Sequence, residues 1–283
     1  MTKTAKHNLF LLRVGFLSLI IIGQLSAFGQ SHPLASTPSK DTSSTLGQYT
    51  LVWHDEFNEK TLDTTNWSYE VNGNGGGNNE LQYYTDSPEN CFLRDGALVI
   101  QALKKSHKGK SYTSARIRTQ KKFSFKYGRV EVVAKVPGGK GIWPAIWMLG
   151  SDISRVGWPA CGEIDMMEYA GKEPHVIHGS IHTTSSHGNT VNTRILDVPT
   201  AETAFHNYAI EWDTKKIDFF VDDSLYYTYK PDNYNDNTWP FNKDFFLILN
   251  VAVGGNFGGA VDDNIFPQTM EVKSVRVYQK TTL

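Results

Sequence analysis

The chain has 283 residues, of which 40% are hydrophobic and 20% are charged, so it carries enough apolar material for one sizeable core and is not a disordered chain. Its 28 Lys and Arg residues are balanced by 29 Asp and Glu residues, and this lack of a cationic surplus argues against a nucleic-acid partner. The 15 Phe, 13 Tyr and 7 Trp residues, with 24 Gly and 11 Pro, indicate a strand-rich, turn-rich fold that has aromatic rings to offer to flat ligands.

Residues 1–29 have the three parts of a secretory signal peptide. The basic side chains of Lys3, Lys6 and Arg13 precede an apolar run at residues 14–22, and small residues follow. We therefore expect export to a secreted or periplasmic location. No stretch reaches the roughly 18 apolar residues that a spanning helix needs, so no membrane span is expected in the mature protein. The alternative is an N-terminal anchor that stays attached.

Residues 30–48 are rich in Ser, Thr and Pro without hydrophobic periodicity, which predicts a flexible linker. Residues 49–283 are then the folded domain, which we expect to be a monomer. Cys91 and Cys161 are too few for a disulfide framework in a domain of this size. Nothing in the sequence places their Cα atoms within bonding reach, so we expect them not to pair.

From residue 49 onward, short apolar or alternating runs are separated by Gly, Asn, Asp and Pro, which is typical of antiparallel strands. Asp222 and Asp223 separate two of these runs and predict a hairpin. No window of about 11 residues keeps a 3.6-residue apolar period, so long helices are not expected. The fold class that results is all-β, a sandwich of two antiparallel sheets. The expected strands are residues 49–53, 97–103, 129–136, 143–149, 176–182, 208–212, 217–221, 225–229, 245–253 and 272–278.

Three acidic residues lie among large apolar residues in a segment that is expected to be a central strand. Glu163 and Asp165 share a strand face because they are two residues apart, whereas Glu168 would point the opposite way in a regular strand. A β-bulge at Met166 or Met167 would bring all three carboxyl groups to one face, with the methionines packed beneath. Since bulges are common beside active sites, the spacing favours a catalytic cluster over a solvated strand face.

Clustered carboxyl groups resist ionising together, so one keeps a proton near neutral pH while another stays charged. This supplies an acid and a nucleophile or base from one residue type. The Cα atoms of Glu163 and Glu168 would lie roughly 13 Å apart along the strand, so their side chains must lean together. The sequence leaves open both the retaining geometry, with carboxyl groups roughly 5 to 5.5 Å apart, and the wider inverting one.

Three tryptophans flank the acidic strand. Trp143 and Trp147 share strand parity, and Trp158 stands next to a proline in a glycine-containing loop just before the acids. A buried tryptophan more often packs a core, but an indole face beside acids is also suited to stack on a sugar ring. The combination favours a carbohydrate site.

Several segments resemble the laminarinase branch of glycoside hydrolase family 16. They are NNELQYYT (78–85), WPAIWML (143–149), GWPACGEIDMMEY (157–169), HGSIHT (178–183), FHNYAIEWD (205–213) and ILNVAVGGNFGG (248–259), in the family's order. The resemblance implies a jelly-roll β-sandwich with a substrate cleft on the concave face. It also implies a retaining endo-glycosidase that hydrolyses internal β-1,3-glucosidic bonds of laminarin-like β-glucan by double displacement.

The same resemblance implies roles for individual residues. Glu163 would be the nucleophile, Glu168 the general acid and then base, and Asp165 the helper between them. The residues expected to contact the sugars are Trp143, Trp147, Trp158, Asn79, Arg116 and His182.

No metal or cofactor is expected. His178 and His182 are four residues apart, but no third ligand presents itself for zinc. Many family members hold a structural calcium on the convex side, with a carboxylate from the last strand where this chain has Lys273. Because lysine cannot ligate calcium, we expect its ammonium to replace the cation's charge against backbone carbonyls near Glu56 and Gly96.

Rival functions stay open. A mixed-linkage β-glucanase or a galactan hydrolase would keep the acids and change the sugar, and a transglycosylase would change the acceptor. A non-catalytic glucan-binding module should have lost one of the acids, and none is missing. The glycine-rich segment 72–79 lacks the Lys-Ser/Thr pair and helix of a phosphate loop, so we interpret it as a loop on the substrate side.

Overall fold

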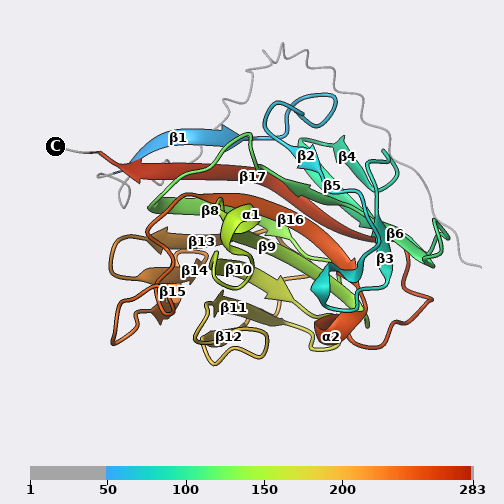
Figure 1. The fold of residues 1–283 in the computed structure, drawn as a ribbon. Coiled ribbons are helices and arrows are strands. Elements are labelled where there is room, and N and C mark those ends of the chain that lie inside the picture. The colour runs from blue at the N-terminus through green and yellow to red at the C-terminus, as the bar shows by residue number, and fades with distance from the viewer. Residues whose placement is uncertain (1–48, 282–283) are drawn as a thin grey trace, which may run out of the picture. The chain divides into compact units, whose positions relative to one another are not determined.

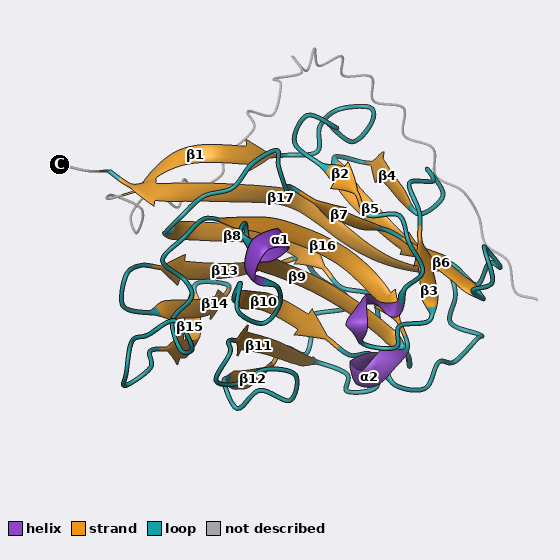
Figure 2. Ribbon diagram, in the orientation of Figure 1, coloured by secondary structure: helices purple, strands orange, loops and turns teal. Residues whose placement is uncertain are grey.

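A computed structural model describes residues 49–281, and strands make up most of the regular structure in this range (Figure 1). The predicted signal peptide (1–29) and linker (30–48) lie outside the described residues. The helices in the described range are single turns, as Figure 2 shows, and none could cross a membrane. They are the 3₁₀-helix η1 (Gly75–Gly77) and the helices α1 (Ile153–Val156) and α2 (Gly255–Gly258).

The first sheet is antiparallel, with strands in the order β15-β14-β13-β8-β17-β5-β4 and with β1 also paired to β17. β14 and β15 form the predicted hairpin, and Asp222 and Asp223 both have positive φ, as a type I′ turn requires. The strands are β1 (Tyr49–Asp55), β4 (Cys91–Arg94), β5 (Ala97–Ala102), β8 (Gly128–Lys135), β13 (His206–Trp212), β14 (Ile217–Val221), β15 (Ser224–Tyr229) and β17 (Gln268–Lys280).

The second sheet is also antiparallel and has the order β12-β11-β10-β9-β16-β7-β2. Its strands are β2 (Ser68–Tyr69), β7 (Arg116–Arg118), β9 (Ile142–Gly150), β10 (Glu163–Tyr169), β11 (Val176–His182), β12 (Thr193–Asp197) and β16 (Phe245–Val253). A separate parallel pair is formed by β3 (Gln82–Tyr84) and β6 (Tyr112–Ser114).

The hydrophobic core lies between the two sheets. Val130 and Val132 of β8 enter it from the first sheet, and Ile146 and Met148 of β9 and Leu247 of β16 enter it from the second. Complete burial of one such aliphatic side chain contributes about 1.5 to 3 kcal/mol, so the apolar face of each strand fixes which way the strand is turned. The all-β sandwich predicted from the sequence is confirmed.

Alternation in the second sheet sends every other side chain to its outer face. In β9, Trp143, Ala145, Trp147 and Leu149 line a cavity on that face, whereas Ile146 lies in the core. A shift of the strand register by one residue would turn the cavity residues of β9 into the core and its core residues out to the cavity. The packing of the core therefore positions the tryptophans of the cavity.

Cys91 and Cys161 are both free and buried, as predicted. Cys91 belongs to β4 and to the main core. Cys161 packs with Leu149, Phe246 and Ile248 in a smaller apolar cluster on the second sheet. The two thiols serve different packing regions and form no bridge.

Lys273 does not make the contact expected from the sequence. It lies at a bulge in β17, and its ammonium nitrogen is 4.2 Å from the ring centroid of Phe205. In the part of the chain that the structure describes, no hydrogen bond joins it to the carbonyls near Glu56 and Gly96. Glu56 is paired with Arg276 instead. The expected contact is wrong, since the bulge gives this side chain an aromatic neighbour that the sequence did not reveal.

Candidate active site

The cavity on the outer face of the second sheet has a volume of about 790 Å³. Its floor runs from β7 across β16, β9 and β10 to β11 and β12. The outward side chains of these neighbouring strands meet there because the strands are paired in register. Of the residues predicted from the sequence, the cavity brings together Glu163, Asp165, Glu168, Trp143, Trp147, Trp158, Arg116 and His182.

The predicted bulge lies in β10. The pairing of β10 with β9 shifts between Asp165 and Met167, and the pairing with β11 shifts between Asp165 and Glu168. Met166 and Met167 are consecutive, yet both are buried in the core. The extra residue therefore returns Glu168 to the face that carries Glu163 and Asp165, and the prediction of one acidic face is confirmed.

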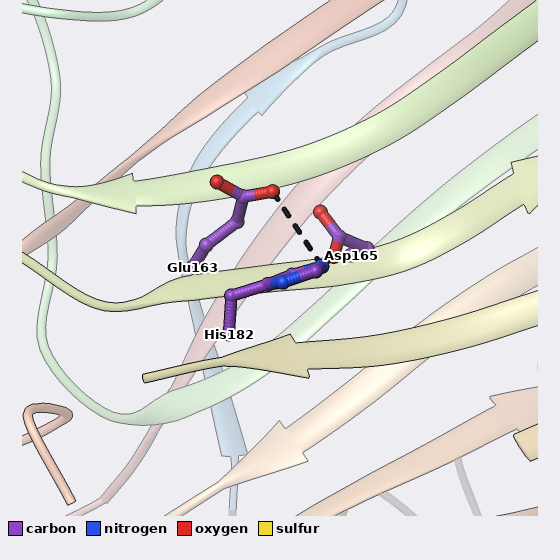
Figure 3. Close-up of side chains that lie close together, drawn as sticks. All are labelled: Glu163, Asp165 and His182. Carbon is purple, nitrogen blue, oxygen red and sulfur yellow. Dashed lines mark ion pairs between the residues drawn. The ribbon is translucent and has the colours of Figure 1, made fainter. Parts of the chain in front are cut away.

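His182 faces two of the acids from the neighbouring strand β11 (Figure 3). Its Nε2 lies 3.1 Å from Asp165 Oδ2 and 4.0 Å from Glu163 Oε1. The backbone N–H of Gly188 donates to Nδ1 over 3.1 Å, so in the neutral ring the hydrogen is on Nε2. The Nε2 edge of the imidazole therefore faces the acids, and positive charge on the ring lowers the pKa of Glu163 and of Glu168.

Two of the tryptophans donate hydrogen bonds to the two glutamates. The indole N–H of Trp158 donates to Glu163 Oε2 over 2.7 Å, and that of Trp143 donates to Glu168 Oε1 over 3.1 Å. Trp158 is 46% exposed and stands at the rim, whereas Trp143 is 9% exposed. These rings are therefore both candidate sugar platforms and donors that orient the glutamates.

The acids have unusual pKa values because they are crowded together away from water. Burial, and then the charge of Asp165, raises the pKa of Glu163 to about 8. Burial is also the main cause that raises the pKa of Glu168 to about 7. Burial and the charge of Glu168 raise the pKa of Asp165 well above its ordinary range. Within the described range no Lys or Arg forms an ion pair with them, so the cluster holds protons near neutral pH.

Arg116 lies at the β7 side of the cavity and is 8% exposed. Its guanidinium carbon is 4.6 Å from the ring centroid of Tyr84 and 5.3 Å from that of Trp147. Asn79 is not part of the cavity wall, although its chain neighbours Asn78 and Glu80 are. The amide of Asn79 donates to the Asn256 side chain, which does line the cavity.

Several cavity residues had no role in the prediction from the sequence. Asn250 accepts the indole N–H of Trp147 over 2.7 Å, and Phe257 packs edge-on against Trp143. Asn250 could have been noticed as the single polar residue in the strand FFLILNVAV, because an uncharged amide in such a run needs a partner. Phe257 lies in a short turn between glycines and carries no comparable signal.

One cluster among the described residues has the ligand types of a metal site. Donor atoms of Glu163, Asp165 and His182 lie within 4.8 Å of one another, and His178 is not part of the group. The set does not suit a metal ion, since the amide of Gly188 occupies Nδ1 and leaves a hydrogen on the Nε2 that faces the acids. The cluster is better suited to moving a proton.

Paired carboxyl groups between tryptophans, in a groove on a β-sandwich, have the chemistry that cleaves a glycosidic bond. The model of the family described as Glycosyl hydrolases family 16 matches residues 78–264. That range includes the acidic strand and the three tryptophans. The chain belongs to glycosyl hydrolases family 16.

Individual relatives agree with this assignment. The chain is 43% identical to a beta-glucanase of Rhodothermus marinus, in an alignment that covers 94% of each protein. It is 39% identical to glucan endo-1,3-beta-glucosidase A1 of Niallia circulans, over 81% of this chain and 38% of that protein. The crystal structure of a laminarinase from Flavobacterium sp. UMI-01 is similar with a TM-score of 0.78 and 51% identity, over 81% of this chain and all of that one. The jelly-roll fold is thereby confirmed.

Proposed function

We propose that the protein is a retaining endo-β-1,3-glucanase that hydrolyses laminarin-like β-glucan. The observation that carries the proposal is the bulged strand β10, which presents Glu163, Asp165 and Glu168 on one face of a groove between tryptophans. The relatives named above are a beta-glucanase, a glucan endo-1,3-beta-glucosidase and a laminarinase, and they support the choice of linkage.

In the first step, Glu168 donates its proton to the glycosidic oxygen while Glu163 attacks the anomeric carbon. The C–O bond to the leaving sugar breaks, and a glycosyl ester forms on Glu163. A pKa of about 7 lets Glu168 hold this proton near neutral pH. The carboxyl groups of the cluster share its protons, so these pKa values belong to the cluster and the reactive form is the one with Glu163 charged and Glu168 protonated. The 2.7 Å hydrogen bond from Trp158 favours the charged form of Glu163.

In the second step, Glu168 is a carboxylate and takes a proton from water, whose oxygen attacks the anomeric carbon and releases Glu163. Burial and the charge of Glu168 raise the pKa of Asp165, which favours its protonated form next to the pair. A proton on Asp165 limits the negative charge of the cluster, so that Glu163 and Glu168 alternate in charge without a third anion beside them. The Nε2 of His182 lies 3.1 Å from Asp165 Oδ2, on the side of the neighbouring strand β11.

A panel of polysaccharides tests the proposal. The purified protein is given laminarin, a mixed-linkage β-1,3-1,4-glucan and agarose, and new reducing ends are followed together with product configuration by proton NMR. We expect fastest release from laminarin, products of several sugar units and an initial β-anomer. Faster release from agarose or the mixed-linkage glucan would move the assignment to that substrate. An initial α-anomer would replace the double displacement by inversion.

We further propose that the protein is exported, acts as a monomer and uses no calcium. The signal-peptide pattern of residues 1–29 supports export. The lysine at position 273 supports independence from calcium, because it stands at the sequence position where relatives are expected to have a carboxylate and a lysine cannot ligate calcium. A thermal melt with and without a chelator checks the last point. A drop of several degrees that added calcium reverses would contradict it.

A further inference from the structure

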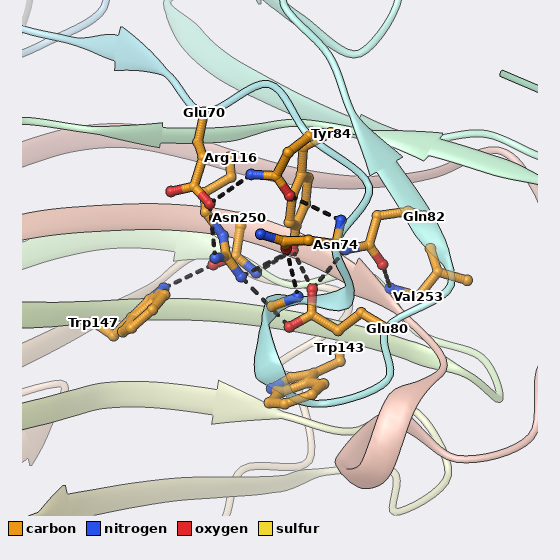
Figure 4. A network of polar contacts seen from close by, with 12 residues as sticks. Glu70, Asn74, Glu80, Gln82, Tyr84, Arg116, Trp143, Trp147, Asn250 and Val253 are labelled. Carbon is orange, nitrogen blue, oxygen red and sulfur yellow. Dashed lines mark hydrogen bonds and ion pairs between the residues drawn. The ribbon is translucent and has the colours of Figure 1, made fainter. Parts of the chain in front are cut away.

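A polar network around Glu80 fills the β7 side of the cavity (Figure 4). Among the described residues, no hydrogen bond joins Glu80 or its partners Gln82, Tyr84 and Arg116 to the three acids of β10. At the centre of the network is the carboxylate of Glu80, a residue only 3% exposed. It accepts hydrogen bonds from Gln82 Nε2 over 2.6 Å and from the hydroxyl of Tyr84 over 3.0 Å, and Arg116 lies 3.5 Å away. A buried carboxylate is strongly destabilising unless such partners surround it, so this network is built around Glu80.

The glycine-rich loop at residues 72–79 rests directly on this carboxylate. Gly76 has φ near +58°, and a Cβ there would stand 2.3 Å from Glu80 Oε1. The loop is also fastened to the segment around α2, since the N–H of Asn256 donates to the carbonyl of Asn78 over 2.8 Å. Gly76, Asn78 and Asn256 all line the cavity. Glu80 thus supports one wall of the groove from below.

The same carboxylate is linked to the indole of Trp147 by two routes. In the first, the Tyr84 hydroxyl accepts from the amide of Asn250 over 3.2 Å, and Asn250 Oδ1 accepts from Trp147 Nε1 over 2.7 Å. In the second, the guanidinium of Arg116 stacks between the rings of Tyr84 and Trp147. The edge and the face of the indole are therefore both held by groups that bind Glu80 or its partner Tyr84.

We propose that Glu80 is a positioning residue that sets the geometry of the Trp147 indole and of the 72–79 loop for sugar binding. The inference rests on the proposed function, because it takes Trp147 as a sugar platform. Glu80 takes no part in proton transfer or attack. Its loss should therefore weaken the binding of substrate and leave the chemical step largely intact.

The first test is Glu80→Gln, which keeps the shape and removes the charge opposite Arg116. With β-1,3-gluco-oligosaccharides as substrate, we expect KM to rise about fivefold or more and kcat to stay within about twofold. The matched control is Glu131→Gln, because Glu131 pairs with the buried Arg129 in the other sheet over 2.7 Å. It should lower Tm to a similar degree without changing KM. A KM that moves equally in both variants, or only in the control, would overturn the proposal.

A double-mutant cycle separates positioning from general loosening. Trp147→Phe removes the indole N–H that the network holds, so adding Glu80→Gln to it should raise KM by much less than Glu80→Gln does in the parent. If the KM changes caused by Glu80→Gln and Trp147→Phe simply multiply in the double variant, the two residues are not coupled and the proposal is contradicted. If Glu80→Gln does not fold, Tyr84→Phe breaks the same route and enters the same cycle. A parent that does not hydrolyse β-1,3-glucan refutes the proposed function itself, whereas an active parent with an unchanged KM in the variants refutes only this inference.

Discussion

Glu168 in the cavity and Glu56 beside the first sheet are the same residue type in opposite surroundings. Glu56 accepts two hydrogen bonds of 2.8 Å from Arg276, which is the main reason that its pKa is below the ordinary value. Glu168 has an indole N–H, further acids and burial around it, and its pKa is raised to about 7. A cation next to an acid stabilises its charged form, and its absence leaves the proton in place.

The contrast separates two uses of acidic residues in one chain. In the first sheet, Arg129 forms ion pairs with Glu131, Glu211 and Asp223, which join neighbouring strands of the fold. In the cavity the acids are left without such partners, which favours reactivity at the expense of stability. Substitutions in the two regions should therefore have opposite effects on stability and very different effects on turnover.

The largest effect is expected from removing the carboxyl groups of the cavity. Glu163→Gln and Glu168→Gln should each lower kcat/KM on laminarin by about a thousandfold or more, because an amide neither attacks nor transfers a proton. Asp165→Asn should be milder but still severe, about ten- to a hundredfold. Reducing-end assays measure the loss, and circular dichroism checks that the fold is kept. Near-normal turnover in Glu163→Gln would remove the proposed mechanism.

The next effect concerns the neutral donors that replace cations in the cavity. The two limbs of the kcat/KM profile report the coupled carboxyl cluster rather than single residues. Trp158→Phe removes a donor that favours the charged form of the nucleophile Glu163, so the acid limb should move to higher pH by about half a unit. Trp143→Phe should raise the pKa of Glu168 and move the alkaline limb upward in the same way. A pH series from about 4 to 10 measures both limbs. If both variants lowered activity equally at every pH, the indoles would serve only as walls.

Most of the architecture could be predicted from the sequence. Val176–His182, Ile217–Val221 and Phe245–Val253 are strands with the predicted bounds, because their apolar runs end at turn residues. The two-residue β2 and the three-residue β7 were missed, since such short polar segments become strands only by pairing with a neighbour. Local pattern carries no information about pairing between distant segments.

The acidic part of the site could be predicted because its signal is local. Glu163, Asp165 and Glu168 lie within one strand, and their odd spacing itself indicates the bulge. The network around Glu80 could not be predicted, because Arg116 and Asn250 reach it from strands far apart in the chain. Lys273 shows the same limit, since it lies in β17 and its neighbour Phe205 precedes β13, a segment far away in the chain.

A smaller effect is expected on stability as a function of pH. The pKa of Glu168 in the folded protein is raised from 4.5 to about 7, so its contribution to stability is complete below about 4.5 and is lost as the pH rises through about 7. The amide that Glu168→Gln introduces does not titrate in this pH range. Its unfolding free energy should therefore gain on that of the parent by on the order of 1 to 3 kcal/mol between pH 5 and pH 8. Urea unfolding at several pH values measures the gain, and a constant difference would contradict the burial of an unpaired acid.

The smallest effect, with the opposite sign, is expected for Glu56→Gln. The folded-state pKa of Glu56 is lowered by Arg276, so its stabilisation is present above the ordinary pKa of 4.5 and is lost as the pH falls through the folded value. The side chain of Arg276 is 39% exposed, and solvent screening limits the effect at pH 7 to about 0.5 to 1 kcal/mol. The unfolding free energy of Glu56→Gln should approach that of the parent at acidic pH, whereas that of Glu168→Gln should rise above the parent's at alkaline pH. Turnover of laminarin should not change, because Glu56 lies outside the cavity wall. A stabilising Glu56→Gln would mean that the ion pair with Arg276 does not outweigh its desolvation, and the contrast between the two regions would then lose its electrostatic basis.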